Sequence, residues 1–266
     1  MYTSKTWYFN RPKTEELFSI EHEFTWMGKC GRKGEKRAKR EKATPEQIKK
    51  QNQRNKENAV RRLMKANWGE NDYWLTLKFP AGTKMRIEEV KDKLSLFLRR
   101  TRDAYKRKNQ MFKFVYRIEI GKRGSPHIHL LVNRIRDADL IIKKNWEHGR
   151  VYFGLAYEEG GFRKLAEYIV KPPNDEVDEK KETVAYNTSR NLIRPEPEKK
   201  TFWRRTVEKM VKEGPKPTPG FFIIPDSVVS GVNPYTGMSY LKYEEVRLKK
   251  KGEGNAGSKR IRGDDS

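Results

Sequence analysis

The chain has 266 residues, and 60 lysines and arginines against 36 aspartates and glutamates give it a formal net charge of +24 at pH 7. This length suits one large domain, or a compact domain with extensions. The charge favours a polyanionic partner, because surface cations gain free energy by releasing condensed counterions from nucleic acid. Basic runs that serve only solubility are the less favoured interpretation.

The single cysteine, Cys30, cannot form an internal disulfide, so the fold does not depend on an oxidising compartment. No run approaches the roughly 18 consecutive apolar residues that cross a bilayer, and the opening residues lack the apolar core of a signal peptide. We therefore expect a cytoplasmic protein with no membrane partner.

Residues 1–70 are expected to form a basic N-terminal arm and one helix. The tract Lys29–Lys42 is strongly basic and has no hydrophobic period, which indicates an irregular arm. Thr44, Pro45 and Gln47 then have the spacing of a capped helix start, and the helix should extend to about residue 66. Its amide-rich first half fits either a solvated helix docked at one end or a helix that contacts DNA.

Residues 71–173 are expected to form a compact domain of alternating strands and helices. The expected order is a strand at 73–79, a helix at 87–105, strands at 112–120 and 127–133, a helix at 137–146, a strand at 150–157 and a helix at 161–170. This order predicts an α+β fold with a ferredoxin-like or RRM-like central antiparallel sheet. Helices are expected on one face, which leaves the other open for a ligand.

Residues 174–266 are expected to form a C-terminal extension. Its polar sequence is punctuated by prolines, and the acidic stretch Asn174–Glu179 indicates a linker or flap. Phe221–Ile224 is a candidate edge strand, although periodicity alone does not decide it. The glycine- and lysine-rich last residues indicate a flexible basic tail.

The hairpin at residues 112–133 carries the clearest chemical signal. Alternate residues of a strand project to the same side, so His127 and His129 share one face. On the preceding strand Glu119 takes that face as well, and a tight turn near Gly124 brings it opposite His127 or His129. Three potential metal ligands are therefore expected to converge.

A His-x-His pattern alone is weak evidence, because two histidines on a strand also occur by chance or for ordinary hydrogen bonding. Here two of the four histidines in the chain lie on one expected face beside a carboxylate. Two neutral imidazoles and one carboxylate leave coordination positions open and suit Mn²⁺ or Mg²⁺, with Zn²⁺ or Co²⁺ as alternatives in vitro. We expect Glu119, His127 and His129 to bind a divalent metal ion.

Tyr168 lies at the border of the apolar stripe of the expected helix at 161–170. Lys164 precedes it by about one turn, and Lys171 follows by just under one turn. An isolated Tyr-x-x-Lys pattern is more often a packing tyrosine with a solvated hydroxyl. Beside the histidine hairpin, the pattern favours a phenol poised to lose its proton.

Glu119 with His127-Ile-His129, followed by Tyr168-Ile-Val-Lys171, resembles the HUH endonucleases. The histidine pair precedes the tyrosine, as in their rolling-circle replication initiators (Rep proteins). The strand from Trp74 lies where the family's first motif lies, and Thr44–Asn67 and Tyr186–Leu192 resemble segments of Rep proteins from bacterial plasmids and integrative elements.

This resemblance implies that Tyr168 attacks a phosphate of single-stranded DNA at a replication origin. The products would be a covalent 5′-phosphotyrosine and a free 3′-hydroxyl, and the reverse attack would rejoin strands. The resemblance assigns phosphate orientation to the metal ion and site positioning or proton transfer to Lys171. Position 164 is Lys and position 172 is Pro, so the single-tyrosine type is implied.

DNA is expected to contact further residues on the sheet face and its surroundings. The candidates are Trp74, Thr76, Lys78, Arg117, Lys122, Arg123, Lys164 and Arg190. The basic arm and the amide-rich helix are candidates for binding adjacent duplex DNA. No Gly-x-x-x-x-Gly-Lys-Ser/Thr motif occurs, so duplex unwinding calls for a separate helicase.

Two alternatives stay open. A single-tyrosine HUH transposase would share the chemistry but serve transposition, and the long basic extensions favour the initiator over it. A non-catalytic RRM-like module would bind single strands through aromatic residues on its open sheet face. The expected face instead carries Glu119, His127 and His129.

Overall fold

The computed structural model describes residues 1–28, 43–121, 124–156, 162–172, 186–233 and 237–248. The tract Lys29–Lys42, the turn residues Lys122 and Arg123, the acidic stretch 174–179 and the tail from residue 249 lie outside the described residues. None of the described helices is long and apolar enough to span a bilayer.

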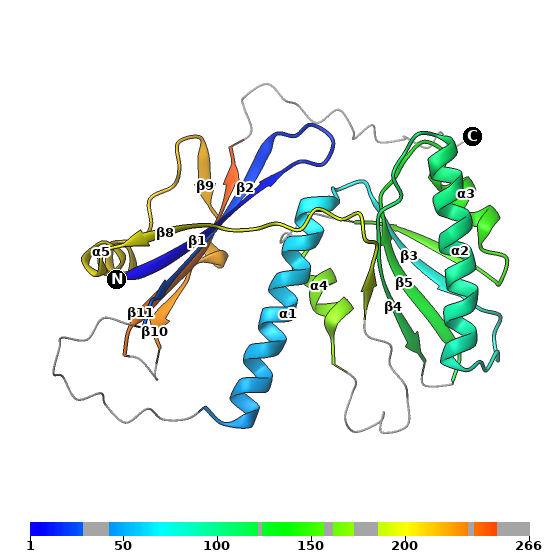
Figure 1. The fold of residues 1–266 in the computed structure, drawn as a ribbon, viewed down its shortest axis with the longest axis horizontal. Helices are drawn as coiled ribbons and strands as arrows, with labels where there is room; N and C mark the ends of the chain where they lie inside the picture. Colours follow the sequence, from blue (N-terminus) through cyan, green and yellow to red (C-terminus); the bar gives the residue numbers. More distant parts are fainter. Residues whose placement is uncertain (29–42, 122–123, 157–161, 173–185, 234–236, 249–266) are drawn as a thin grey trace, which may run out of the picture. The chain divides into compact units, whose positions relative to one another are not determined.

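The chain divides into two compact units (Figure 1). Unit 1 combines residues 1–8, 17–40 and 197–266, and unit 2 combines residues 9–16 and 41–196. This division differs from the three consecutive segments expected from the sequence. The reason is strand pairing across the whole chain, because strands near the N-terminus pair with strands near the C-terminus.

Unit 1 is built on a six-stranded sheet, in which β9 pairs with β11 beside the strand path β10-β11-β2-β1-β8. The candidate strand at 221–224 is confirmed as β9. Helix α5 (Arg204–Glu213) packs on the sheet through Val207, which joins an apolar cluster with Tyr2, Phe24 and Leu241. The strands are β1 (Tyr2–Asn10), β2 (Leu17–Trp26), β8 (Glu198–Phe202), β9 (Phe221–Ile223), β10 (Val229–Val232) and β11 (Ser239–Arg247), and η1 (Pro225–Ser227) is a short 3₁₀ helix.

Unit 2 contains a five-stranded antiparallel sheet in the order β6-β3-β5-β4-β7. The predicted α+β class is confirmed, and each element expected between residues 73 and 170 is present within a few residues of its expected bounds. The elements are β3 (Tyr73–Lys78), α2 (Ile87–Arg107), β4 (Phe114–Ile120), β5 (Pro126–Val132), α3 (Ala138–Asn145), β6 (Val151–Leu155), α4 (Arg163–Val170) and β7 (Asn187–Thr188).

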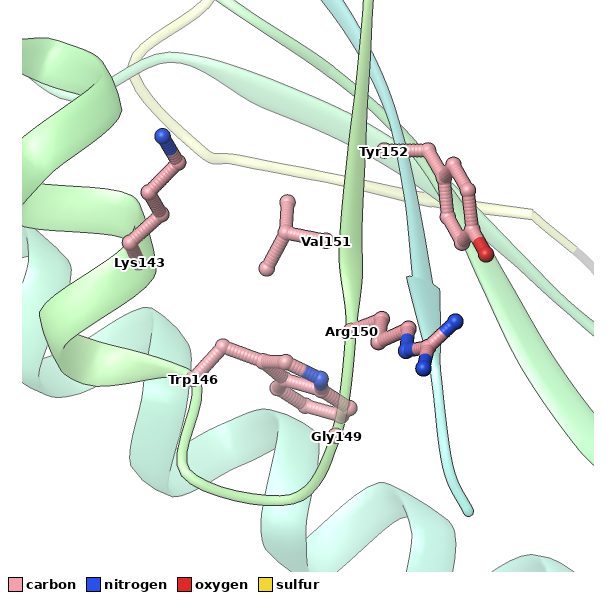
Figure 2. A pocket seen from close by; sticks show the side chains of 6 residues that line it. All are labelled: Lys143, Trp146, Gly149, Arg150, Val151 and Tyr152. Atoms are coloured by element: carbon pink, nitrogen blue, oxygen red, sulfur yellow. The ribbon is translucent and has the colours of Figure 1, made fainter. Parts of the chain in front are cut away.

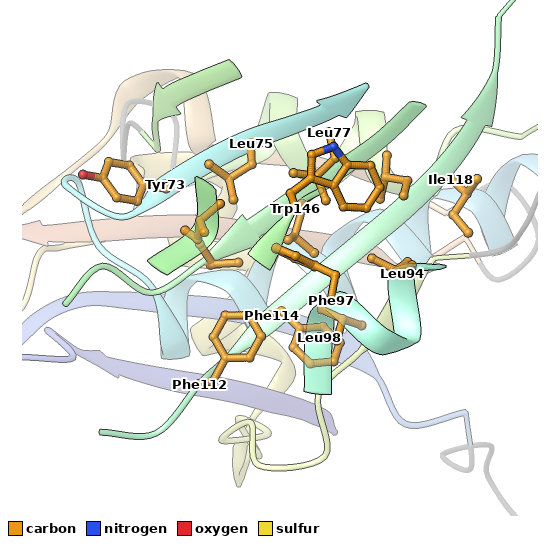
Figure 3. Packing of buried hydrophobic residues seen from close by; sticks show 14 of the residues in the cluster. Tyr73, Leu75, Leu77, Leu94, Phe97, Leu98, Phe112, Phe114, Ile118 and Trp146 are labelled. Carbon is orange, nitrogen blue, oxygen red and sulfur yellow. The ribbon is translucent and has the colours of Figure 1, made fainter. Parts of the chain in front are cut away.

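The main core of unit 2 lies between the sheet and helices α2 and α3 (Figure 3). Alternating apolar residues of β3, β4 and β5 point to this side and are fully buried: Leu75, Leu77, Ile118, Ile128 and Leu130. Helix α2 packs against them with residues spaced three or four apart, including Val90, Leu94 and Phe97. Removal of these apolar side chains from water therefore fixes both the helix face and the sheet face.

Helix α1 (Pro45–Asn67) begins with the expected capping box. The backbone amide of Gln47 donates to Thr44 Oγ1 over 3.3 Å, and the Thr44 amide donates to Gln47 Oε1 over 2.8 Å. The second half of α1 packs against α4, and Gln53 Nε2 donates to the Val170 carbonyl at 3.0 Å. The helix at 45–66 is thus confirmed, with one end docked on α4.

The second sheet face is partly covered and partly open. Val115 and Leu131 lie on this face, where strict alternation would place polar residues, and both are fully buried in a cluster with α1 and α4. Their apolar side chains explain why two helices pack here as well as on the opposite face. The neighbouring rows toward the β4–β5 turn carry polar side chains and form the site described below.

Leu130→Ala should lower the free energy of unfolding by about 2–5 kcal/mol, because the lost side chain leaves a cavity between the sheet and α2. Urea denaturation measures this loss. The matched control is Leu140→Ala on α3, where the side chain is 61% exposed and the change should stay within about 0.5 kcal/mol. Equal effects of the two substitutions would contradict this core.

Candidate active site

The register of β3, β4 and β5 assembles the polar face. Glu119 pairs with His127, and Arg117 pairs with His129. On the other side of β5, Thr76 pairs with His129, and Lys78 pairs with His127. Directly paired residues of antiparallel strands project to the same face, so these side chains form two adjacent rows across the sheet.

Glu119, His127 and His129 form a compact group that could hold a metal ion. Each offers one ligand atom, and these atoms lie within 4.8 Å of one another. Glu119 Oε2 is 3.3 Å from His127 Nε2 and 3.7 Å from His129 Nε2. The structure therefore brings together the three residues that the sequence nominates as ligands.

The surroundings of His129 fit a metal ligand. Its Nε2 atom is buried and has no hydrogen-bond partner among the described residues, which is costly for a polar atom unless a ligand uses its lone pair. Thr76 Oγ1 lies 3.3 Å from His129 Nδ1. A proton on Nδ1 can be donated to this hydroxyl, which leaves the Nε2 lone pair directed at the cluster.

Protonation equilibria favour cation binding at neutral pH. The close approach of His127, with further help from the Tyr168 hydroxyl and the charge on Arg117, lowers the pKa of Glu119 to about 2 despite its partial burial. Burial, reinforced by the neighbouring His127, lowers the pKa of His129 to about 4. Glu119 is therefore ionised and His129 neutral, which are the forms that coordinate metal ions.

Tyr168 reaches the same carboxylate from α4. Its Oη atom donates a hydrogen bond to Glu119 Oε2 at 2.8 Å, and its ring lies edge-on to His129, with centroids 4.9 Å apart. Burial and the hydrogen bond to the negatively charged Glu119 raise the pKa of the phenol above its ordinary value. In this arrangement the hydroxyl of Tyr168 is therefore protonated.

The position of Tyr168 follows from the sequence of α4. Phe162, Ala166 and Ile169 are buried and attach the helix to the sheet and α1, while Lys164 and Glu167 are exposed. Tyr168 is intermediate in burial, so its ring lies at the edge of the apolar stripe with the hydroxyl toward the cluster. The expected border position of Tyr168 is thus the observed one.

Arg117 links the end of α4 to Glu119. Its Nη1 donates to the carbonyls of Ile169 at 3.0 Å, of Tyr168 at 3.4 Å, and of Lys171. Its Nε lies 3.1 Å from Glu119 Oε1. Carbonyls in the last turn of a helix lack partners within the helix, and a cation there is favoured by the helix dipole.

Arg117 is expected from the sequence to contact DNA, but its side chain is only 6% exposed. Its contacts place it inside the protein, where it holds α4 and the carboxylate together. Sequence patterns could not reveal this role, because the carbonyls that Arg117 binds belong to a helix about fifty residues away.

Trp74 and Lys78 lie beside the cluster. Trp74 is half-buried and stacks on His129, with ring centroids 5.7 Å apart and planes within 15°. Lys78 is exposed, and its Nζ lies 4.6 Å from the ring centroid of Tyr152 on β6. Tyr152 is absent from the sequence-based candidates, although alternation in its strand places it on the same face as Thr76.

The other candidates lie at the margins or outside the described residues. Lys164 is exposed on α4, and Arg190 is exposed just after β7. Lys171 ends α4 with an exposed side chain, and its described contact to the site is made by its carbonyl. Lys122 and Arg123 belong to the turn that the structure does not describe.

Arg117→Met should loosen the end of α4, because it leaves buried carbonyls without their charged donor. The expected loss is about 2 kcal/mol or more of unfolding free energy, together with faster amide hydrogen exchange in residues 163–171. Arg163→Met, on the exposed face of the same helix, is the control and should leave exchange unchanged. Unchanged exchange in Arg117→Met would refute the tether.

Mn²⁺ should bind the wild-type protein and raise its midpoint of thermal unfolding, by about 2.7 kcal/mol of stabilisation at a concentration 100-fold above Kd. His129→Ala should abolish both effects, because it removes one of the three ligands. Isothermal titration calorimetry and thermal scans measure them. His148→Ala, which removes a histidine outside the cluster, should bind Mn²⁺ normally. Normal binding by His129→Ala would exclude this site.

Comparison with known proteins adds one finding. A family model described as "Replication-associated protein" matches residues 72–173. No curated protein and no solved structure gives a significant match. The matched segment runs from the start of β3 to the end of α4 and contains Glu119, His127, His129 and Tyr168. The part of the chain that carries the site is therefore similar to replication-associated proteins.

Proposed function

We propose that this protein initiates rolling-circle replication by nicking and rejoining single-stranded origin DNA, with Tyr168 as the nucleophile. One observation carries the proposal: the Tyr168 hydroxyl lies 2.8 Å from Glu119 Oε2, in the cluster that could hold a metal ion. The similarity of residues 72–173 to replication-associated proteins supports DNA as the substrate and replication as the process.

In the proposed reaction, Tyr168 Oη attacks the scissile phosphorus of the DNA strand. A bond forms between the phenolic oxygen and phosphorus, and the bond from phosphorus to the 3′-oxygen breaks. The 5′-phosphate becomes linked to the tyrosine, and the 3′-oxygen leaves as a hydroxyl that can prime synthesis. One phosphodiester replaces another, so the step needs no ATP and is reversed when a 3′-hydroxyl attacks the phosphotyrosine.

Tyr168 must lose its proton during this attack. The ionised carboxylate of Glu119 opposes that loss, since it accepts the phenolic hydrogen bond and raises the pKa of the phenol. A divalent cation bound by Glu119, His127 and His129 would neutralise this charge and polarise the phosphate oxygens. Arg117 holds α4 so that the phenol stays near the cluster.

Further residues have proposed roles around this centre. Lys171, which follows Tyr168 at the end of α4, positions the site or accepts the phenolic proton. Trp74, Thr76 and Lys78 bind the strand on the open sheet face, and Lys164 and Arg190 contribute positive charge at its margin. A separate helicase would unwind the duplex, and the reaction would take place in the cytoplasm.

The test is formation of a covalent adduct. Labelled single-stranded oligonucleotides, tiled across both strands of the element that encodes the protein, are incubated with Mn²⁺ and resolved under denaturing conditions. The wild type should retain a 3′-end label on the protein and release the 5′-labelled fragment with an extendable 3′-hydroxyl. Tyr168→Phe should form no adduct, and chelation of the metal should prevent adduct formation.

The control for this test is Tyr8→Phe, which removes an exposed phenol from unit 1 and should leave adduct formation unchanged. An adduct formed by Tyr168→Phe would refute the nucleophile. A 5′-end label retained on the protein would refute the proposed polarity.

A further inference from the structure

An aromatic side chain extends the site across the sheet. Arg117, His129, Thr76 and Tyr152 are consecutive partners in the registers of β4, β5, β3 and β6, so they form one row on the open face. Tyr152 ends this row on β6, which is an edge strand among the described residues. Its side chain is 49% exposed, which is unusual for a large aromatic residue on a sheet.

The distance along this row suits a polynucleotide. Neighbouring strands are spaced by about 4.8 Å, so the backbone at Tyr152 lies roughly 10 Å from that at His129, two strands away. This separation matches one or two nucleotides of an extended single strand. A strand with its phosphate at the cluster would therefore reach Tyr152 with an adjacent nucleotide.

Positive charge surrounds the Tyr152 ring. Lys78 Nζ lies 4.6 Å from the ring centroid, and the Lys78 amide donates to the Arg150 carbonyl at 2.9 Å. Figure 2 shows the side chains of Arg150 and Tyr152 on one side of β6, opposite Val151. Both cations are exposed, so a phosphate beside the ring would find two charged donors.

The edge of the sheet is firmly built at this point. Arg150 and Tyr152 also border a hollow of about 380 Å³, lined otherwise by Lys143, Trp146, Gly149 and Val151. Gly149 has φ +145°, and a Cβ atom there would lie 2.2 Å from the Lys78 carbonyl oxygen. Trp146 Nε1 donates to the same carbonyl at 3.3 Å. These contacts fix the loop before β6 and hence the start of the strand that carries Tyr152.

We propose that Tyr152, Lys78 and Arg150 form a subsite for one nucleotide that flanks the scissile phosphate. The base stacks on the Tyr152 ring, and Lys78 and Arg150 bind the neighbouring phosphate. Stacking on an aromatic ring accepts any base, so the subsite holds the strand without reading its sequence. The inference rests on the proposed function for the identity of the strand as single-stranded DNA.

Fluorescence anisotropy with a labelled oligothymidylate of about 12 nucleotides tests the subsite. Tyr152→Ala should raise Kd about tenfold, and Tyr152→Phe should stay within about twofold because it keeps the ring. Leu155→Ala is the matched control on the same strand. Its side chain is 37% exposed and belongs to the row that pairs with Tyr73, on the opposite face, so Kd should not change.

A strand of the same length without bases separates stacking from charge. It should bind the wild type about as weakly as the oligothymidylate binds Tyr152→Ala, and Tyr152→Ala should cause no further loss. Wild-type affinity of Tyr152→Ala for the oligothymidylate, or an equal loss on both strands, would overturn the subsite. Preference for an oligouridylate over the oligothymidylate would overturn DNA as the occupant.

The adduct assay distinguishes the two proposals. If Tyr152→Ala loses affinity as expected but the wild type never forms an adduct, the subsite stands and the nicking function fails. If the wild type forms the adduct and Tyr152→Ala binds and reacts normally, the function stands and the subsite fails.

Discussion

The antiparallel register between β4 and β5 is the constraint on which the site depends. Glu119 faces His127 and Arg117 faces His129 because Ile118, Ile128 and Leu130 bury their side chains on the opposite side of the sheet. A slip of one residue would reverse every side chain of a strand, placing histidines in the core and isoleucine or leucine in water. The apolar core therefore selects the register that assembles the polar cluster.

A second constraint joins the sheet to a helix that is not part of it. The cluster lies on strands, whereas Tyr168 lies on α4, so only tertiary contacts can hold them together. Arg117 makes that connection, because one guanidinium binds both the last carbonyls of α4 and the carboxylate of Glu119. Movement of α4 and movement of Glu119 are thus coupled through a buried charge, which is costly to leave without partners.

The sequence predicts much of unit 2, because its signals are local. Alternation in β3 to β5, the period of α2, the cap at Thr44 and the shared face of His127 and His129 all follow from neighbouring residues. Val115 and Leu131 were a readable signal that part of the second face is buried, since they break the polar alternation. The fold of unit 1 was not predicted, because pairs such as Phe24 with Leu241 join distant segments without a local pattern.

The most direct test of Tyr168 as the nucleophile is to identify the residue that becomes linked to DNA. The adduct formed with single-stranded DNA and Mn²⁺ is trimmed with nuclease, digested with protease and sequenced by tandem mass spectrometry. We expect a 5′-phosphonucleotide on Tyr168, in a peptide that spans the end of α4. Linkage to any other tyrosine, or to a residue outside the matched segment 72–173, would contradict this assignment.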